Sequence, residues 1–175
     1  MSFDHRDPGT PEAQWARCGA LYRAPELDLA GVDRVVVFAA HPDDETLGAG
    51  GTVHRLVRAG ADVRVVVATL GENSHPDSTT YASHELAEVR REEMVAALRT
   101  LVGPDAAPHF LDLSDGSLTE EQLRAPVAEH VAWAEQGRKP LVLSTWEQDG
   151  HTDHDTLGRT CLLYTSDAAD DSLRV

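Results

Sequence analysis

The sequence predicts an α/β protein with a Rossmann-like layered fold, in which a mostly parallel sheet is flanked by helices. Residues 34–40 (RVVVFAA) form a continuous apolar run, which is typical of a strand buried on both faces of a parallel sheet. Residues 45–60 place apolar side chains at helical spacing and stop at a glycine, and residues 62–70 (DVRVVVATL) form a second apolar run. A strand, helix and strand unit of this kind joins parallel strands through a right-handed crossover.

The alternation of helices and strands continues along the chain. We expect a helix at 82–101, a strand at 109–113, a helix at 117–137 and a strand at 140–146. The second of these helices opens with a capping-box pattern from Thr119 to Gln122. Pro126 lies inside it, so we expect either a break there or a helix that begins near the proline.

Length and composition indicate one globular domain preceded by an arm. The chain has 175 residues, of which 41% are hydrophobic and 26% charged. Residues 1–33 contain three prolines and little periodicity, so we expect an N-terminal arm with at most a short helix around Glu12 to Leu21. No apolar stretch approaches the ~20 residues of a membrane span, and no secretory signal is visible. We therefore expect a cytoplasmic protein with no membrane partner, and the oligomeric state stays open.

The charge balance excludes polyanions as partners. Fifteen Lys and Arg residues against thirty Asp and Glu residues give a net charge of −15, which repels nucleic acid. The two cysteines, Cys18 and Cys161, have no metal or redox spacing. A metal would therefore be held by histidine and carboxylate ligands, and we expect a small molecule as the partner.

Two clusters of polar side chains follow predicted strands at their carboxyl ends. The first, His41 to Glu45 (HPDDE), follows the strand at 34–40, and the second, WEQDGHTDHD at 146–155, follows the strand at 140–146. Ligands of open parallel sheets bind beyond the carboxyl ends of the strands. Two clusters that are 110 residues apart (151 − 41) can therefore face one cleft.

Metal chemistry explains the residue types in both clusters. His41 and Asp44 lie three apart across a strand-to-helix turn, which turns both side chains to one side, and His154 would complete a set of three ligands typical of catalytic zinc. Asp43 points elsewhere and can hydrogen-bond a water at the metal. Asp43, Asp44 and Glu45 are also ordinary caps for a following helix. Capping does not explain His41 beside a buried strand, so we favour the metal site.

The residues of both clusters resemble a known family. AAHPDDETLGAGG (39–51) with the later GHTDH (150–154) is similar to the signatures of the zinc-dependent N-deacetylases of PIG-L and LmbE type. Three further segments resemble the same family: TLGE (69–72), RREEMVAALRTL (90–101) and FLDLSDGSL (110–118). The resemblance implies an LmbE-like deacetylase domain over residues 34–160.

The resemblance implies a metal-dependent amidohydrolase that removes an acetyl group from an N-acetylglucosamine-like or related N-acyl amino sugar. The ligands it implies for Zn²⁺, or for another divalent metal in the same site, are His41, Asp44 and His154. Asp43 would be the general base that takes a proton from the attacking water. His151 would stabilise the oxyanion or help to protonate the leaving amine, and Asp153 would hold that imidazole in position.

Other polar residues with counterparts in the family are left out of the predicted catalytic set. They are Glu72, Arg90 and Glu93. An Arg and a Glu three apart on a helix are more often a surface or structural pair than a catalytic one. Trp146 precedes the GHTDH segment (150–154) and could stack on a sugar ring, although a rim or core tryptophan is more common.

The sequence departs from the family pattern at two places. Thr152 stands where the family has proline, which changes the stiffness of the loop and removes no candidate ligand. After Thr160, the segment CLLYTSDAADDSLRV does not continue the apolar stripe of the preceding helix and resembles a translated sequencing adapter. We therefore expect a C-terminally truncated domain, and a non-native tail at 161–175 in which Cys161 and Tyr164 have no function.

Two other functions are compatible with the same residues. One is a non-catalytic α/β domain that binds metal or sugar and is inactive through truncation. The other is a metal-dependent phosphoesterase, which we disfavour because two-metal sites prefer more ligands and because neither cluster contains a Lys or Arg for a phosphate.

Overall fold

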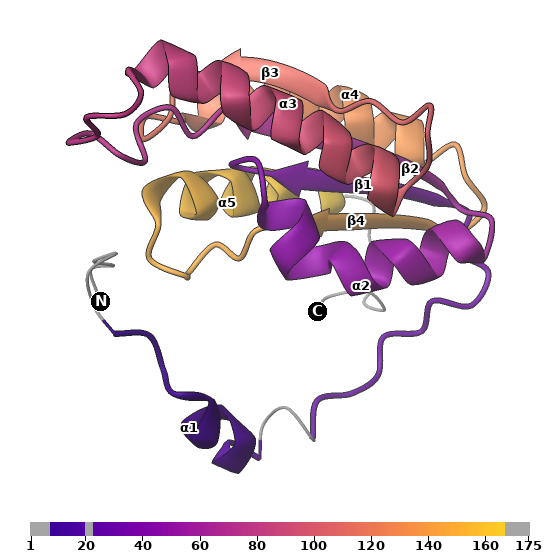
Figure 1. Ribbon diagram of the computed structural model, residues 1–175. Coiled ribbons are helices and arrows are strands. Elements are labelled where there is room, and N and C mark those ends of the chain that lie inside the picture. The colour runs from indigo at the N-terminus through magenta and orange to yellow at the C-terminus, as the bar shows by residue number, and fades with distance from the viewer. Residues whose placement is uncertain (1–7, 20–22, 167–175) are drawn as a thin grey trace.

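A four-stranded parallel sheet forms the centre of the structure (Figure 1). This computed structural model describes residues 8–19 and 23–166. The strands are β1 (Arg34–Ala39), β2 (Asp62–Thr69), β3 (His109–Leu113) and β4 (Pro140–Ser144), and they lie in the order β3-β2-β1-β4. The predicted α/β class is confirmed, and the predicted strand ends shift by only a few residues.

Helices cover both faces of the sheet. The described helices are α1 (Glu12–Arg17), α2 (Asp44–Arg58), α3 (Ser83–Leu101), α4 (Glu120–Ala134) and α5 (Thr152–Ser166). Alternate residues of β1 point to opposite faces: Val35 and Val37 pack with α2 and α3, while Val36 and Phe38 pack with α4 and α5. None of these helices is long and apolar enough to cross a membrane.

The helix that contains Pro126 differs from the prediction. α4 runs without a break through the proline, so the expected break or late start was wrong. Proline removes one backbone hydrogen bond from a helix interior. Leu123 and Val127, on either side of Pro126, are both 0% exposed and belong to the core cluster under α4. Burial of side chains on both sides of the proline holds the helix together.

The last described helix also extends beyond its predicted end. The apolar stripe was expected to stop near Thr160, but α5 runs to Ser166 and Cys161 is 3% exposed within the core cluster. Tyr164 packs against the same cluster. The expectation that the stripe stops was therefore wrong. Residues 167–175 of the predicted tail lie outside the described residues, and the non-native origin of the tail stays a prediction.

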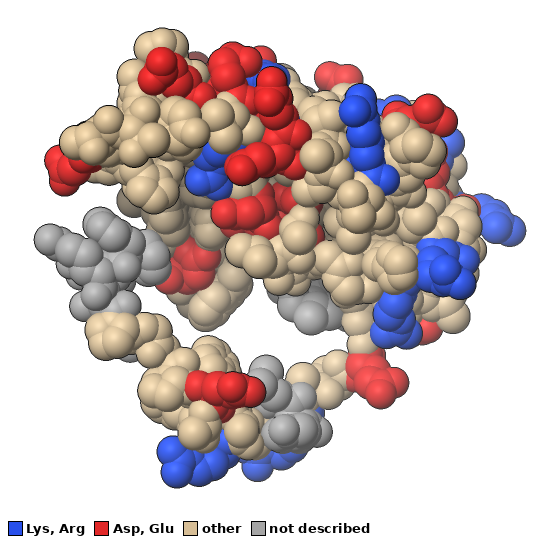
Figure 2. Space-filling view, viewed as in Figure 1, with Lys and Arg blue, Asp and Glu red and all other residues tan. Residues whose placement is uncertain are grey.

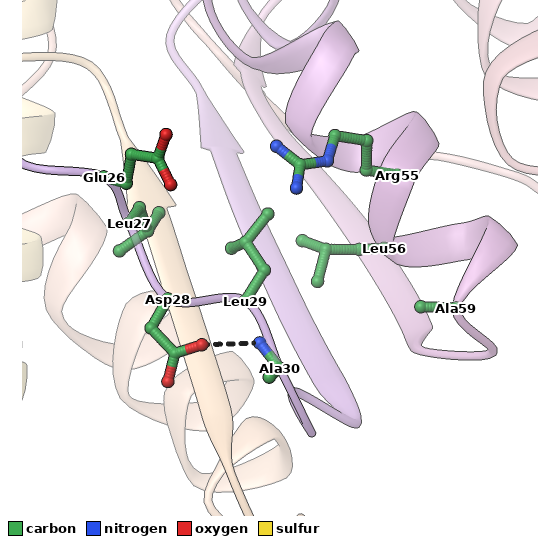
Figure 3. A pocket seen from close by; sticks show the side chains of 8 residues that line it. All are labelled: Glu26, Leu27, Asp28, Leu29, Ala30, Arg55, Leu56 and Ala59. Atoms are coloured by element: carbon green, nitrogen blue, oxygen red, sulfur yellow. Dashed lines mark hydrogen bonds between the residues drawn. The ribbon is translucent and has the colours of Figure 1, made fainter.

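The N-terminal arm contains the short helix that the sequence predicted, as α1. Residues 1–7 and 20–22 of the predicted arm, including the expected helix end at Leu21, lie outside the described residues. The following segment, Glu26 to Ala30, lines a pocket of about 550 Å³ together with Arg55 and Leu56 of α2 and with Ala59, which follows that helix. Figure 3 shows these side chains. This pocket lies near the last turn of α2, at the far end of that helix from Asp44.

Candidate metal centre and active site

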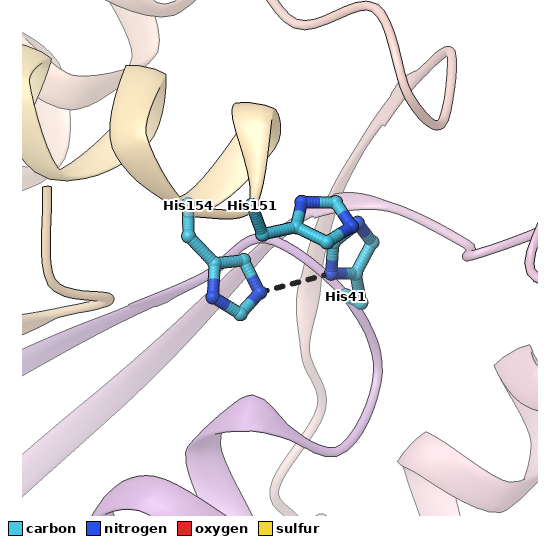
Figure 4. A group of neighbouring side chains, drawn as sticks. All are labelled: His41, His151 and His154. Carbon is cyan, nitrogen blue, oxygen red and sulfur yellow. Dashed lines mark hydrogen bonds between the residues drawn. The ribbon is translucent and has the colours of Figure 1, made fainter. Parts of the chain in front are cut away.

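The two polar clusters meet at the carboxyl edge of the sheet. His41 follows β1, His154 lies in the first turn of α5 after β4, and β1 pairs directly with β4. The Nδ1 of His41 lies 3.2 Å from the Nε2 of His154 (Figure 4). Because neighbouring parallel strands end at the same edge, side chains from distant parts of the sequence share one site.

Asp44 completes a triangle with these two imidazoles. Its Oδ1 lies 3.4 Å from the Nε2 of His154, and its Oδ2 lies 3.8 Å from the Nδ1 of His41. Ligand atoms about 2.0–2.2 Å from a tetrahedral zinc are about 3.4 Å from one another. The distances of 3.2, 3.4 and 3.8 Å are close to that spacing, and the two that involve Asp44 are made by different oxygens of its carboxylate. Burial raises the pKa of Asp44, but its contacts with His154 and His41 outweigh burial and leave that pKa below its ordinary value.

The other nitrogen of His41 faces two further carboxylates. Its Nε2 lies 3.2 Å from Asp115 Oδ1 and 3.2 Å from Asp153 Oδ2. Burial lowers the pKa of His41, but these two contacts outweigh it and raise the pKa to about 9. The same negative charge that favours a proton on His41 favours a metal cation beside it.

Asp153 contacts partners other than those the sequence suggested. We expected its carboxylate to hold His151, but the side chain is 1% exposed and accepts hydrogen bonds from the backbone N–H groups of Gly116 and Leu118 as well as facing His41. It is the backbone N–H of Asp153 that donates to His151 Nδ1, at 3.2 Å.

His151 packs against both proposed ligand histidines. Its ring centroid lies 4.7 Å from that of His41, edge to face, and 4.8 Å from that of His154. Burial, followed by the positive charge of the two neighbouring imidazoles, lowers its pKa. Among the described residues, two groups have potential ligand atoms that all lie within 4.8 Å of one another: His41, His151 and His154, and His41, Asp115 and Asp153. Asp44 belongs to neither group.

Asp43 is the N-cap residue of α2 and has a strained backbone conformation. Its φ of 127° is in a region that residues other than glycine rarely adopt. The carboxylate is 54% exposed, and its Oδ2 lies 3.2 Å from the Nη2 of Arg90. Burial raises the pKa of Asp43 above its ordinary value, and the charge of Arg90 opposes part of that change.

A pocket of about 330 Å³ lies beside these side chains. It is lined by His41, Asp43, Gly71, Asn73, Ser74, Arg90, Asp115, Gly116 and His151. Figure 2 shows acidic side chains gathered where Figure 1 places α3 and the start of α2. The candidate base, Asp43, and the candidate oxyanion donor, His151, therefore line the same pocket.

A known family model matches most of this chain. The model of PIG-L, described as GlcNAc-PI de-N-acetylase, covers residues 36–164. The chain belongs to the PIG-L family. The predicted resemblance is confirmed, and the match reaches four residues beyond Thr160, the predicted end of the domain.

Curated relatives of this PIG-L chain include two named 1D-myo-inositol 2-acetamido-2-deoxy-alpha-D-glucopyranoside deacetylase. The protein of Mycobacterium sp. (strain KMS) is 38% identical over 70% of this chain and 47% of its own length. That of Corynebacterium glutamicum (strain R) is 33% identical over 73% of this chain and 50% of its own length. The chain spans about half the length of the curated relatives it matches.

Solved structures show the same fold. The N,N'-diacetylchitobiose deacetylase of Pyrococcus horikoshii aligns with a TM-score of 0.68 and 25% identity, covering 92% of this chain and 60% of its own. The conserved protein TT1542 of Thermus thermophilus aligns with a TM-score of 0.59 and 28% identity, covering 79% and 57%. GalB, a 4-carboxy-2-hydroxymuconate hydratase of Pseudomonas putida, shares the fold at 20% identity and a TM-score of 0.62, covering 80% and 58%.

Residues outside the predicted catalytic set also reach the site of this PIG-L chain. Arg90 lines the pocket and contacts Asp43, and Asp115 faces His41. Glu72 accepts a hydrogen bond from the backbone N–H of Asp115 at 2.9 Å. Their signal was the family-like segments at 69–72, 90–101 and 110–118. Glu93, from the same set, is exposed.

Proposed function

We propose that the protein is a metal-dependent amidohydrolase that removes the acetyl group from an acetamido sugar. The observation that carries the proposal is the triangle of His41, Asp44 and His154 beside a pocket that Asp43 and His151 line. The relatives named above support the substrate class, since their printed names describe deacetylases of an acetamido-glucopyranoside and of diacetylchitobiose.

The metal would be held by His41 Nδ1, the carboxylate of Asp44 and His154 Nε2. Zinc held there would supply Lewis acidity, which polarises an amide carbonyl and lowers the pKa of a water molecule to about 7. Asp115 and Asp153 accept the Nε2 proton of His41, and this leaves Nδ1 free as a ligand.

Asp43 would act as the general base. Its carboxylate lines the pocket and takes the proton of the water that attacks the amide carbonyl. Because burial raises the pKa of Asp43, the carboxylate accepts that proton more readily than a fully solvated aspartate would. The proton is then available to the amine that leaves, so that amide and water yield acetate and an amino sugar.

His151 would stabilise the charge that develops on the carbonyl oxygen. Its ring lines the pocket on the side of His41, and an imidazole N–H there can donate to an oxyanion. Asp153 would act on His151 through its backbone N–H and on His41 through its carboxylate.

The proposal is tested by acetate release from acetamido sugars by the zinc-loaded chain. We would assay N-acetylglucosaminyl-inositol and diacetylchitobiose, with Asp43→Asn as the inactive control and zinc bound per chain measured in parallel. Zinc binding with acetate release that Asp43→Asn abolishes would support the hydrolase. Zinc binding with no release from either sugar would favour the non-catalytic binding domain.

A further inference from the structure

The two ring nitrogens of His154 face different partners. Its Nε2 lies 3.4 Å from Asp44 Oδ1 and 3.2 Å from His41 Nδ1, on the side of the proposed metal. Its Nδ1 is hydrogen-bonded to the Oδ2 of Asp149. A neutral imidazole carries one proton, and a proton on Nδ1 that is donated to Asp149 leaves the lone pair of Nε2 for a metal.

Asp149 is itself held in place by the loop that carries it. Its Oδ1 accepts a hydrogen bond from the backbone N–H of His151 at 2.8 Å. Gly150, between the two residues, has a φ of +95°, a conformation that glycine adopts readily. The carboxylate of Asp149 therefore binds both the backbone N–H of His151 and the ring of His154, which lies in the first turn of α5.

The arrangement repeats what is seen at the other imidazole. His41 turns Nδ1 toward His154 and turns Nε2 toward Asp115 and Asp153. Each of the two histidines thus has a carboxylate behind the nitrogen that faces away from the triangle. Carboxylates in this position fix the tautomer and orientation of a ligand histidine and make it a stronger donor to the metal.

We propose that Asp149 is a positioning residue that holds His154 in the tautomer and orientation required to bind the metal. This inference rests on the metal centre of the proposed function and not on the identity of the substrate. The side chain of Asp149 is 34% exposed, whereas that of Asp153 is 1% exposed. Asp149 can therefore be replaced with less damage to the core than the carboxylates behind His41.

The test is the zinc affinity of the whole chain, measured by competition with a chromogenic chelator. We expect Asp149→Ala to bind zinc on the order of 10–100-fold more weakly than wild type. Asp149→Asn keeps the shape and one acceptor oxygen but loses the charge, and should fall between the two. Asp155→Asn is the matched control, since Asp155 accepts from the backbone N–H of Gly150 in the same loop and should bind zinc as wild type does.

A spectroscopic readout separates positioning from a loss of fold. In the zinc-loaded wild type, nitrogen NMR of the histidine rings should show His154 with a proton on Nδ1 that exchanges slowly with water. In Asp149→Asn that proton should exchange faster while the melting temperature stays close to that of Asp155→Asn.

The outcomes distinguish this inference from the proposed function. Equal zinc affinity in Asp149→Ala and Asp155→Asn would overturn the role of Asp149 and leave the metal centre intact. Zinc coordinated through His154 Nδ1 would overturn it as well. Tight zinc binding that depends on Asp149, with no acetate release, would support the role of Asp149 and refute the proposed deacetylase function. No zinc binding by wild type would overturn both.

Discussion

The Nη2 of Arg90 donates a hydrogen bond to the backbone carbonyl of Pro42, inside the turn that carries the site. The same nitrogen lies 3.2 Å from the Oδ2 of Asp43, whose φ of 127° is strained. A guanidinium has several donors in a rigid plane, so it can hold the turn and the carboxylate together. The strained conformation of Asp43 is therefore supported from α3.

We predict that Arg90→Lys lowers kcat on the order of 10²-fold, because a lysine cannot hold both groups and a small displacement of a catalytic side chain has an effect of that size. Zinc content should not change, since Arg90 contacts none of the proposed ligands. The matched control is Arg91→Lys: Arg91 is its neighbour on α3 and pairs with Asp112 instead. Equal rates in the two variants would refute the role of Arg90.

Asp43 and Asp44 are adjacent but should behave differently. Asp43→Asn should retain one zinc per chain and lose turnover, because its carboxylate faces the pocket. Asp44→Asn should lose zinc as well, because Asp44 lies within 3.4 and 3.8 Å of the two imidazoles. Metal analysis after dialysis and acetate release on the same samples separate the two. Loss of zinc from both variants would contradict the division of roles.

His151 is the residue for which two roles compete. As an oxyanion donor, His151→Ala should lower the rate by roughly 10²–10³ and keep zinc. As a third histidine ligand with His41 and His154, it should be needed for zinc, and Asp44→Asn should retain the metal. We expect the first result, because the carboxylate of Asp44 lies close to both imidazoles, with Oδ1 3.4 Å from His154 Nε2 and Oδ2 3.8 Å from His41 Nδ1. Comparison of zinc affinity in the two variants decides between the roles.

The sequence was sufficient for the fold and for the meeting of the two clusters. Apolar runs such as 34–40 predict strands that are buried on both faces, and polar residues that follow parallel strands are predicted to meet at one edge of the sheet. Both features can therefore be predicted from local patterns. The uninterrupted helix through Pro126 could not be predicted in this way, because the burial on either side of the proline is a tertiary effect that local patterns do not contain.

The partners within the site could not be predicted in the same way. Arg90 and Glu93 have the spacing of an ordinary surface pair, and only the crossing of α3 over the turn at Pro42 separates their roles. Asp153 precedes His154 directly, yet its carboxylate turns toward His41, because the N–H groups of Gly116 and Leu118 bind it. Such choices depend on loops that approach from other strands.

Gly71 should be required for the position of Arg90. Its φ is +64°, and a Cβ there would lie 3.2 Å from the guanidinium. We predict that Gly71→Ala lowers stability by about 1–3 kcal/mol and also lowers kcat. Gly60→Ala is the matched control, because Gly60 has a φ of +89° and nothing within 4 Å of the added Cβ. Gly60→Ala should lose a similar amount of stability and keep the kcat of wild type. An equal loss of kcat in Gly60→Ala and Gly71→Ala would contradict the prediction.

His130 should make the stability of the fold sensitive to acid. It is 5% exposed, and burial, followed by the charge of His109, lowers its pKa. The unfolded chain, in which histidine titrates near 6.5, then takes up the proton more readily than the folded protein does. The contribution of neutral His130 to the free energy of unfolding is thus fully present above about pH 6.5 and is lost as the pH falls below that value. His130→Phe should reduce the fall in melting temperature between about pH 7.5 and 5.5. His54 is exposed, so the control variant His54→Phe should show the same decrease in melting temperature as wild type. An equal decrease in His130→Phe and His54→Phe would assign the acid sensitivity to other groups.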